Sequence, residues 1–173
     1  MDERPWPSLL KLAELSRGPL TRRIAAPQPI REAIARQLAV DGLDKLEAQV
    51  EAAPWLDGAR LRGRLDAVVR QTCGVTLEPL ETVIEASFDL KLLPAGSPNA
   101  PSEPDEAVLD PEAEDPPELV EDETIDLGAV VVEQLSLEID PFPRKPGAVF
   151  DTGPVDEPPS PFAALKDFKP KGG

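Results

Sequence analysis

The sequence predicts an α+β fold in which an antiparallel β-meander carries two packed helices, with a disordered acidic insert and a C-terminal tail. Three segments between residues 45 and 92 alternate apolar and polar residues with a period of two, as half-buried strands do. Two other segments repeat their apolar residues at helical spacing. We expect one domain, with a main body at 1–93, a linker at 94–123, a returning helix at 124–143 and a flexible tail at 144–173.

The main body begins with short elements. Residues 7–12 are apolar without a clear period and should form a short strand or an arm, and residues 19–26 a short strand. A helix is predicted from Pro29, because proline suits the first helical position, where its missing N–H has no partner to lose. It ends before Gly42 and carries one apolar stripe, which consists of Ile30, Ile34 and Leu38.

Two long strands follow this helix, and their alternation predicts an antiparallel hairpin. Apolar residues from Leu46 to Ala52 alternate with polar ones, and the pattern resumes from Arg60 to Arg70. Attraction between opposite charges predicts the register in which Glu51 lies opposite Arg60. The other pairs of this register are Gln49–Arg62, Glu47–Arg64 and Lys45–Asp66 outside, and Val50–Leu61, Ala48–Gly63 and Leu46–Leu65 inside.

A third strand ends the main body, and an acidic linker follows it. Alternation from Val83 to Leu92 predicts this strand, after a loop that contains Gly74 and Pro79. Residues 94–123 are rich in proline and acid and hold few apolar anchors. Burial there cannot offset an ordering cost of about 1–2 kcal/mol per residue, so we expect the linker to be disordered.

Order should return at Thr124 with a second helix. Asp126 suits the N-cap position, and an apolar stripe at helical spacing follows it. Pro141 and Pro143 end the element, because proline cannot continue a helix. The stripe consists of Leu127, Val131 and Leu135.

Charge is distributed unevenly along the chain, whose net charge is −15. Residues 101–126 hold 12 acids and no base, whereas residues 1–95 hold 14 acids and 13 bases. This distribution disfavours sequence-independent binding of nucleic acid, and it fits either repulsion of nucleic acid or contact with a basic protein surface. The N-terminus lacks a signal-peptide pattern and no apolar run is long enough to cross a bilayer, so we expect a cytoplasmic protein without membrane contact.

Missing residue types exclude several chemistries. The chain has no histidine, which excludes Ser-His-Asp and Cys-His catalysis and histidine-ligated metals. Its single cysteine, Cys73, allows neither an intramolecular disulfide nor a zinc ribbon. As a nucleophile Cys73 would need a nearby base, and only Arg70 is close in sequence, so a buried structural thiol is favoured. We therefore expect that the protein is not an enzyme and binds no cofactor.

The acidic segment could in principle ligate divalent cations. Hard cations need several oxygens in fixed positions, and this segment has prolines but no EF-hand spacing. The favoured interpretation is that the acidic segment is a solvated tether that binds a partner.

Four arginines are an alternative site, for direct contact with RNA phosphates. They share one strand face and are Arg60, Arg62, Arg64 and Arg70. The favoured interpretation is instead that they pair across the sheet with Glu47 and Glu51. No aromatic residues alternate with them, so a platform for base stacking is missing.

An apolar patch near the end of the tail is the main candidate for partner binding. It would dock in a partner groove as a short helix or fold back on its own domain. Its candidate anchors are Phe162, Leu165 and Phe168.

Three short motifs resemble a known family. They lie at residues 71–80 with the strand end at 88–90, at residues 125–144, and at residues 161–165, where the tail is similar to that of the alphaproteobacterial branch. Over about residues 8–168 the chain resembles the YceD-like proteins, also called large ribosomal RNA subunit accumulation proteins. The signature positions are Cys73, Asp126, Leu127, Pro141 and Pro143.

The resemblance implies a role in the synthesis or stability of large-subunit (23S) ribosomal RNA. Some relatives have a second cysteine soon after the first and a cysteine cluster after the final helix, resembling a zinc site, but this chain keeps only Cys73 and no metal is expected. We expect a non-catalytic ribosome-biogenesis factor that binds a basic ribosomal or assembly protein. The acidic insert would attract this partner electrostatically, and the tail patch would anchor it. Direct binding of ribosomal RNA is the alternative.

Overall fold

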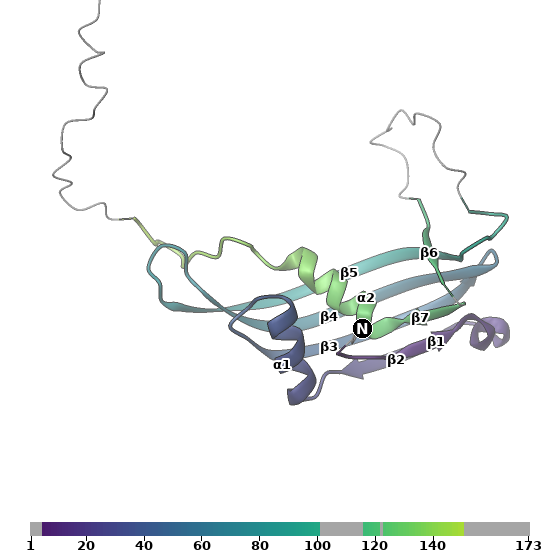
Figure 1. Ribbon diagram of the computed structural model, residues 1–173, viewed down its shortest axis with the longest axis horizontal. Coiled ribbons are helices and arrows are strands. Elements are labelled where there is room, and N and C mark those ends of the chain that lie inside the picture. Colours follow the sequence, from purple (N-terminus) through teal and green to yellow (C-terminus); the bar gives the residue numbers. More distant parts are fainter. Residues whose placement is uncertain (1–4, 101–115, 122, 151–173) are drawn as a thin grey trace, which may run out of the picture.

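A long antiparallel meander forms the body of the protein, as the alternating segments predict. The computed structural model describes residues 5–100, 116–121 and 123–150, and Figure 1 shows its elements. The observed architecture confirms the α+β fold class. In chain order the elements are β1 (Leu9–Lys11), the 3-10 helix η1 (Leu12–Arg17), β2 (Leu20–Ala25), α1 (Gln28–Gln37), β3 (Gly42–Trp55), β4 (Gly58–Thr72), β5 (Pro79–Pro94), β6 (Glu118–Val120), β7 (Thr124–Asp126) and α2 (Leu127–Glu138).

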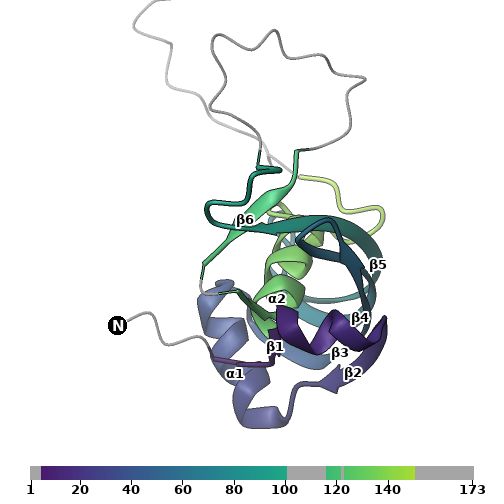
Figure 2. The same cartoon turned by 90° about the vertical axis from the view of Figure 1, so that its right-hand side faces the viewer.

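Five strands make one sheet in the order β2-β3-β4-β5-β6. Neighbours run antiparallel except β6, which pairs in parallel with the end of β5. β1 and β7 form a separate two-stranded sheet. Figure 2 shows the large sheet curving around α2, so one face is concave and covered while the other turns away from the helices.

The hydrophobic core lies between the concave face and the elements that cover it. Nearly every second residue along β3 and β4 is buried there. Fully burying a leucine, isoleucine or valine side chain contributes about 1.5–3 kcal/mol to stability. Such burial holds the covering elements on the sheet. Those elements contribute Ile34 from α1, Leu10 and Ile125 from the small sheet, and Leu127, Val131 and Leu135 from α2.

Both predicted helices are present, and their first residues explain where they begin. Pro29 occupies the first turn of α1. Asp126 is the N-cap of α2, as predicted, because its Oδ1 accepts the backbone N–H groups of Gly128 at 3.1 Å and Ala129 at 3.3 Å. The same oxygen accepts the N–H of Ser8 at 2.9 Å, which ties the N-terminal segment to the start of the helix.

The predicted register of the β3–β4 hairpin is wrong by two residues, although its faces are right. Glu51 lies opposite Arg62, and Arg60 lies opposite Ala53. The argument from opposite charges considered β3 and β4 alone, whereas the hairpin closes on Trp55 and Gly58 with only two residues between them. A two-residue turn sets the register of a hairpin. The observed inner pairs are Ala52–Leu61, Val50–Gly63, Ala48–Leu65 and Leu46–Ala67.

The ends of the acidic linker belong to the sheet, which corrects the expectation of disorder there. β6 lies within the segment 94–123 and pairs with Leu92–Pro94 of β5. The N–H of Ala95 also donates to the carbonyl of Val120 at 2.8 Å. Three residues of strand were too few to stand out among prolines and acids. Residues 101–115, where the rest of that prediction falls, lie outside the described residues.

Candidate functional site

The sheet face that turns away from the helices is the candidate interaction surface, and we call it the open face. Its side chains alternate with those of the core, and most of them are exposed. The open face consists of Thr21, Arg23 and Ala25 on β2, Lys45, Glu47, Gln49 and Glu51 on β3, Arg60, Arg62, Arg64, Asp66, Val68 and Arg70 on β4, and Glu81, Val83, Glu85, Ser87, Asp89 and Lys91 on β5.

Charges on the open face form rows whose sign alternates from strand to strand. Three residues depart from the pattern, Lys45, Asp66 and Lys91. Opposite charges on neighbouring strands attract across the ladder, so each row stabilises the rows beside it. The rows are Arg23 on β2, Glu47 and Glu51 on β3, Arg60, Arg62, Arg64 and Arg70 on β4, and Glu81, Glu85 and Asp89 on β5.

Asp89 is the most strongly held carboxylate of these rows. It accepts two hydrogen bonds from Arg60, both of 2.7 Å, and a third from Nε of Arg62 at 3.1 Å. The hydrogen bonds from Arg60 are the largest cause of a pKa lowered to about 2, and the one from Arg62 lowers it further, against the opposing effect of burial. The carboxylate is therefore ionised throughout the physiological pH range.

The four arginines considered for RNA binding all have carboxylate partners. Arg60 and Arg62 share Asp89, while Arg70 binds Asp44 at 2.8 Å. Arg64 binds two carboxylates, Glu85 at 2.7 Å and Asp66 at 3.8 Å. The arginines thus pair across the sheet, but chiefly with β5 rather than with Glu47 and Glu51 as expected. A face balanced in this way offers phosphates little excess positive charge.

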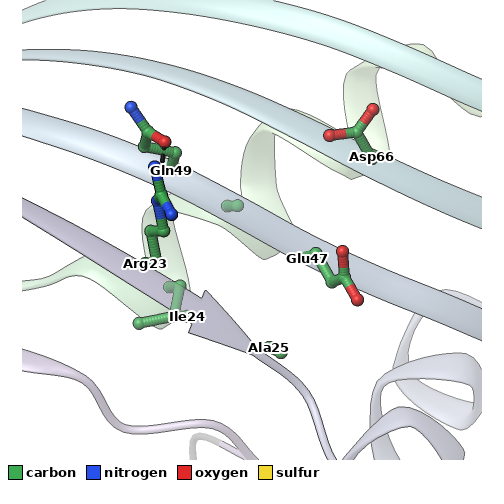
Figure 3. A pocket seen from close by; sticks show the side chains of 7 residues that line it. Arg23, Ile24, Ala25, Glu47, Gln49 and Asp66 are labelled. Atoms are coloured by element: carbon green, nitrogen blue, oxygen red, sulfur yellow. Dashed lines mark hydrogen bonds between the residues drawn. The ribbon is translucent and has the colours of Figure 1, made fainter.

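A small hollow lies on the open face where β2, β3 and β4 meet. Its volume is about 280 Å³, and its walls combine the alternating charges of the three strands. Figure 3 shows Arg23 reaching Gln49, while Glu47 and Asp66 stand on the other side of the hollow. The Nε of Arg23 donates to Oε1 of Gln49 at 2.9 Å. The hollow is therefore polar and is lined by side chains of both charges.

The acidic insert leaves the domain at the end of the sheet that β6 closes. Beside β6, Asp57 in the β3–β4 turn accepts hydrogen bonds from the side chains of Asn99 and Ser97, both of 2.9 Å. These bonds, that of Asn99 first, lower the pKa of the Asp57 carboxyl. The start of the insert is thereby attached to the hairpin turn as well as to β5.

The opposite end of the sheet holds Cys73 and the segment that follows α2. The N–H of Gly74 donates to the carbonyl of Pro143 at 2.9 Å, and the ammonium of Lys145 binds Glu78 at 2.9 Å. The N–H of Lys145 also donates to the Cys73 sulfur at 3.3 Å. Residues far apart in sequence therefore meet at this thiol, and the segment that contains Pro143 and Lys145 is attached beside the start of β5.

Cys73 is buried, as the sequence favours, and its surroundings promote ionisation of the thiol. A hydrogen bond from the Thr76 side chain is the largest cause, followed by the backbone N–H groups of Thr76, Lys145 and Val75. Together they outweigh the effect of burial and lower the pKa of the thiol to about 6. Lys145 was not found from the sequence, because no periodic pattern links positions 72 residues apart. Thr76 lies three residues after Cys73, but the sequence does not show that it hydrogen-bonds to the sulfur.

The other predicted site residues fall into two groups. Phe162, Leu165 and Phe168 lie outside the described residues. Of the family-signature positions, Asp126 and Leu127 lie at the start of α2, and Pro141 and Pro143 lie in the segment that reaches Cys73. In the described ranges, no helix is long and apolar enough to cross a membrane.

Comparison with known proteins identifies the family. The model of the family described as "Large ribosomal RNA subunit accumulation protein YceD" matches residues 61–169, from β4 to the tail. No curated protein and no solved structure matches the chain. The family match covers more than half of the 173 residues and includes β5, α2 and the three resembling motifs. The chain therefore belongs to the YceD family, whose name assigns it a role in the accumulation of large-subunit ribosomal RNA.

Proposed function

We propose that this protein promotes accumulation of large-subunit ribosomal RNA by binding a basic ribosomal or assembly protein in the cytoplasm, without catalysing a reaction. The observation that carries the proposal is the separation of charge. The sheet balances its own charges, whereas residues 101–126 hold 12 acids and no base. Proteins that neutralise RNA phosphates are rich in lysine and arginine, and an acidic segment attracts them over a distance.

The fold supports an elongated binding surface. The insert leaves beside β6, whereas the described chain ends beyond the Cys73 end, at Phe150. β5 links the two ends with 16 residues, which corresponds to about 50 Å of strand. A partner that contacts both ends of the described sheet would therefore need an extended segment, such as the unfolded arm of a basic protein.

Direct binding of ribosomal RNA through Arg60, Arg62, Arg64 and Arg70 is the competing function. RNA phosphates would have to displace carboxylates that already hold these guanidinium groups, and the nearby aspartates and glutamates would repel them. A gel-shift assay with large-subunit RNA fragments distinguishes the two. We expect no shift at physiological salt; a shift that Arg62→Glu abolishes would favour RNA binding instead.

A binding assay tests the proposed function. Proteins stripped from purified large ribosomal subunits are applied to the immobilised chain at low and at high salt. We expect salt-sensitive retention of a basic protein, which weakens when the acids Glu112, Glu114 and Asp115 are changed to their amides. The control changes three acids of the tail, Asp151, Asp156 and Glu157, in the same way. Equal loss with both triplets, or no retention at low salt, would contradict the proposal.

A further inference from the structure

We propose that the outer edge of β5 docks an extended basic segment of the partner protein as an added β-strand. This inference rests on the proposed function, since it names the place where the basic partner is held. The edge comprises the outward-facing backbone of Leu80–Leu90 and the side chains beside it.

In the part of the chain that the structure describes, no strand pairs with the outer side of this edge. β4 pairs with β5 along its length, from Pro79 to Leu92, whereas β6 covers only Leu92–Pro94 on the other side. Within the described residues, Leu80–Leu90 form no backbone hydrogen bond other than those to β4. A row of unpaired N–H and C=O groups is the template that an extended peptide uses when it adds a strand to a sheet.

β5 also lacks three of the features that usually protect an edge, and the one it has, a row of charged side chains, repels added strands that are acidic. Proteins shorten their edge strands, interrupt them with proline or bend them with bulges. β2, at the other edge of the sheet, has six residues and lies between Pro19 and Pro27. β5 has 16 residues, no bulge against β4 and no proline between Pro79 and Pro94. An open edge of this length is what a docking strand requires.

The charge rows indicate that the added strand is basic. From β2 to β5 the rows of the open face run positive, negative, positive, negative. The last row, at the free edge, is acidic, and it consists of Glu81, Glu85 and Asp89. A further strand continues the alternation only if its side chains on the open face are lysine or arginine.

The concave side of β5 sets the other half of the pattern. Ala86 and Leu90 pack against the core but remain only partly buried. A strand added beside β5 would place alternate side chains over them, and apolar side chains would extend the core there. The occupant that fits the edge is therefore an extended segment in which basic and apolar residues alternate.

A synthetic peptide provides the probe. We use eight residues of alternating lysine and valine, fluorescently labelled, and a control peptide of alternating glutamate and valine. Affinity for the full chain is measured by fluorescence anisotropy, and the contact is located by hydrogen exchange. We expect the lysine peptide to bind and to slow exchange within Leu80–Leu90. Protection elsewhere, equal binding of both peptides, or no binding because a second copy already occupies the edge would overturn the proposal.

Two charge reversals provide matched variants. Glu81 and Glu51 are both exposed, each faces an arginine of β4, and reversal changes the net charge equally. Only Glu81 lies at the free edge. We expect Glu81→Lys to lower the affinity for the lysine peptide by about tenfold, because the reversal changes the charge close to the docked strand by two units. We expect Glu51→Lys to change this affinity by less than about twofold. Equal effects would show general attraction and overturn docking at the edge.

The same two variants separate this inference from the proposed function. If large-subunit proteins are retained in a salt-sensitive way but Glu81→Lys and Glu51→Lys retain them equally, edge docking fails and the proposed function stands. If the lysine peptide docks at β5 but no large-subunit protein is retained, the proposed function fails.

Discussion

The carboxylate of Asp89 on β5 binds the guanidinium of Arg60 on β4 through both of its oxygens. The two residues do not face each other directly, because Asp89 lies opposite Arg62 in the ladder. The pair therefore reaches diagonally along the strands, and one carboxylate holds two arginines of the same row. This arrangement explains why a strand rich in arginine can lie on an exposed sheet without repelling itself.

Replacing Asp89 with alanine should destabilise the sheet modestly. Arg60 and Arg62 would lose their shared counterion, and we expect the free energy of unfolding to fall by about 0.5–1 kcal/mol, since the group is more than a third exposed. Urea denaturation measures this. Glu81→Gln, which removes a carboxylate of the same row, is the control and should change stability less.

The pH dependence of this contribution follows from its lowered pKa. Asp89 contributes its stability above the ordinary pKa of an aspartate, near 4, and loses it as the pH falls towards about 2. The stability difference between the native protein and Asp89→Ala should therefore shrink between pH 4 and pH 2. A difference that stays constant over this range would contradict the ion pairing described for Asp89.

The thiol of Cys73 should titrate near pH 6. The chain has one cysteine and no tyrosine, so thiolate absorbance near 240 nm reports this residue against a steady background. Thr76→Val removes the largest cause of the lowered pKa and should raise the midpoint towards 9. Cys73→Ser gives the baseline, and a native midpoint above 8 would contradict the hydrogen bonds described at the sulfur.

The same thiol should make stability depend on pH. Its pKa is lower in the folded than in the unfolded chain, so its contribution is complete above about pH 9 and is lost as the pH falls through about 6. Relative to Cys73→Ser, the native protein should therefore gain stability as the pH rises from 6 to 9. Parallel unfolding curves for the two proteins across this range would be the contrary result.

Asp126→Ala should destabilise the start of α2. The substitution removes an acceptor shared by Ser8, Gly128 and Ala129 in a buried place, and we expect a loss of about 2 kcal/mol. Asp126→Asn retains an acceptor oxygen and should lose less. Thermal unfolding followed by circular dichroism compares them, and equal losses would argue against the N-cap.

Gly63→Ala should be more damaging than Gly74→Ala. A Cβ at Gly63 would overlap the ring of Phe88, its partner on β5, whereas a Cβ at Gly74 meets only the Pro143 carbonyl oxygen at 3.8 Å. Overpacking of this kind costs about 1–3 kcal/mol. Chemical denaturation measures the free energy of unfolding of both variants. If Phe88 packs closely on Gly63, the loss must be larger for Gly63→Ala.

Local sequence patterns predicted the strands and helices, but not the long-range pairings. Alternation correctly assigned Leu61 and Leu65 to the core, because periodicity reports which face is buried. The register failed because the two-residue turn between Trp55 and Gly58 sets it, and because Arg60 and Arg62 bind Asp89 on the third strand and not Glu51. Charge matching between two strands cannot include a partner on a third.

The site was harder to predict than the fold for the same reason. Arg60 and its neighbours could be found from their spacing, but their carboxylate partners and the free edge of β5 depend on strand order. Strand order is set by tertiary packing, as is the meeting of Cys73 with Lys145. β6 has three residues and Glu118 and Leu119 are exposed, so it carries too little pattern to be recognised.

Crosslinking in living cells, with protein and RNA partners recovered from the same sample, tests the central claim most directly. We predict crosslinks from β5 and the acidic insert to a basic protein of the large subunit, and none from the arginines of β4 to ribosomal RNA above background. Ribosomal RNA crosslinked at Arg62 or Arg64, with no basic protein at β5, would contradict the account.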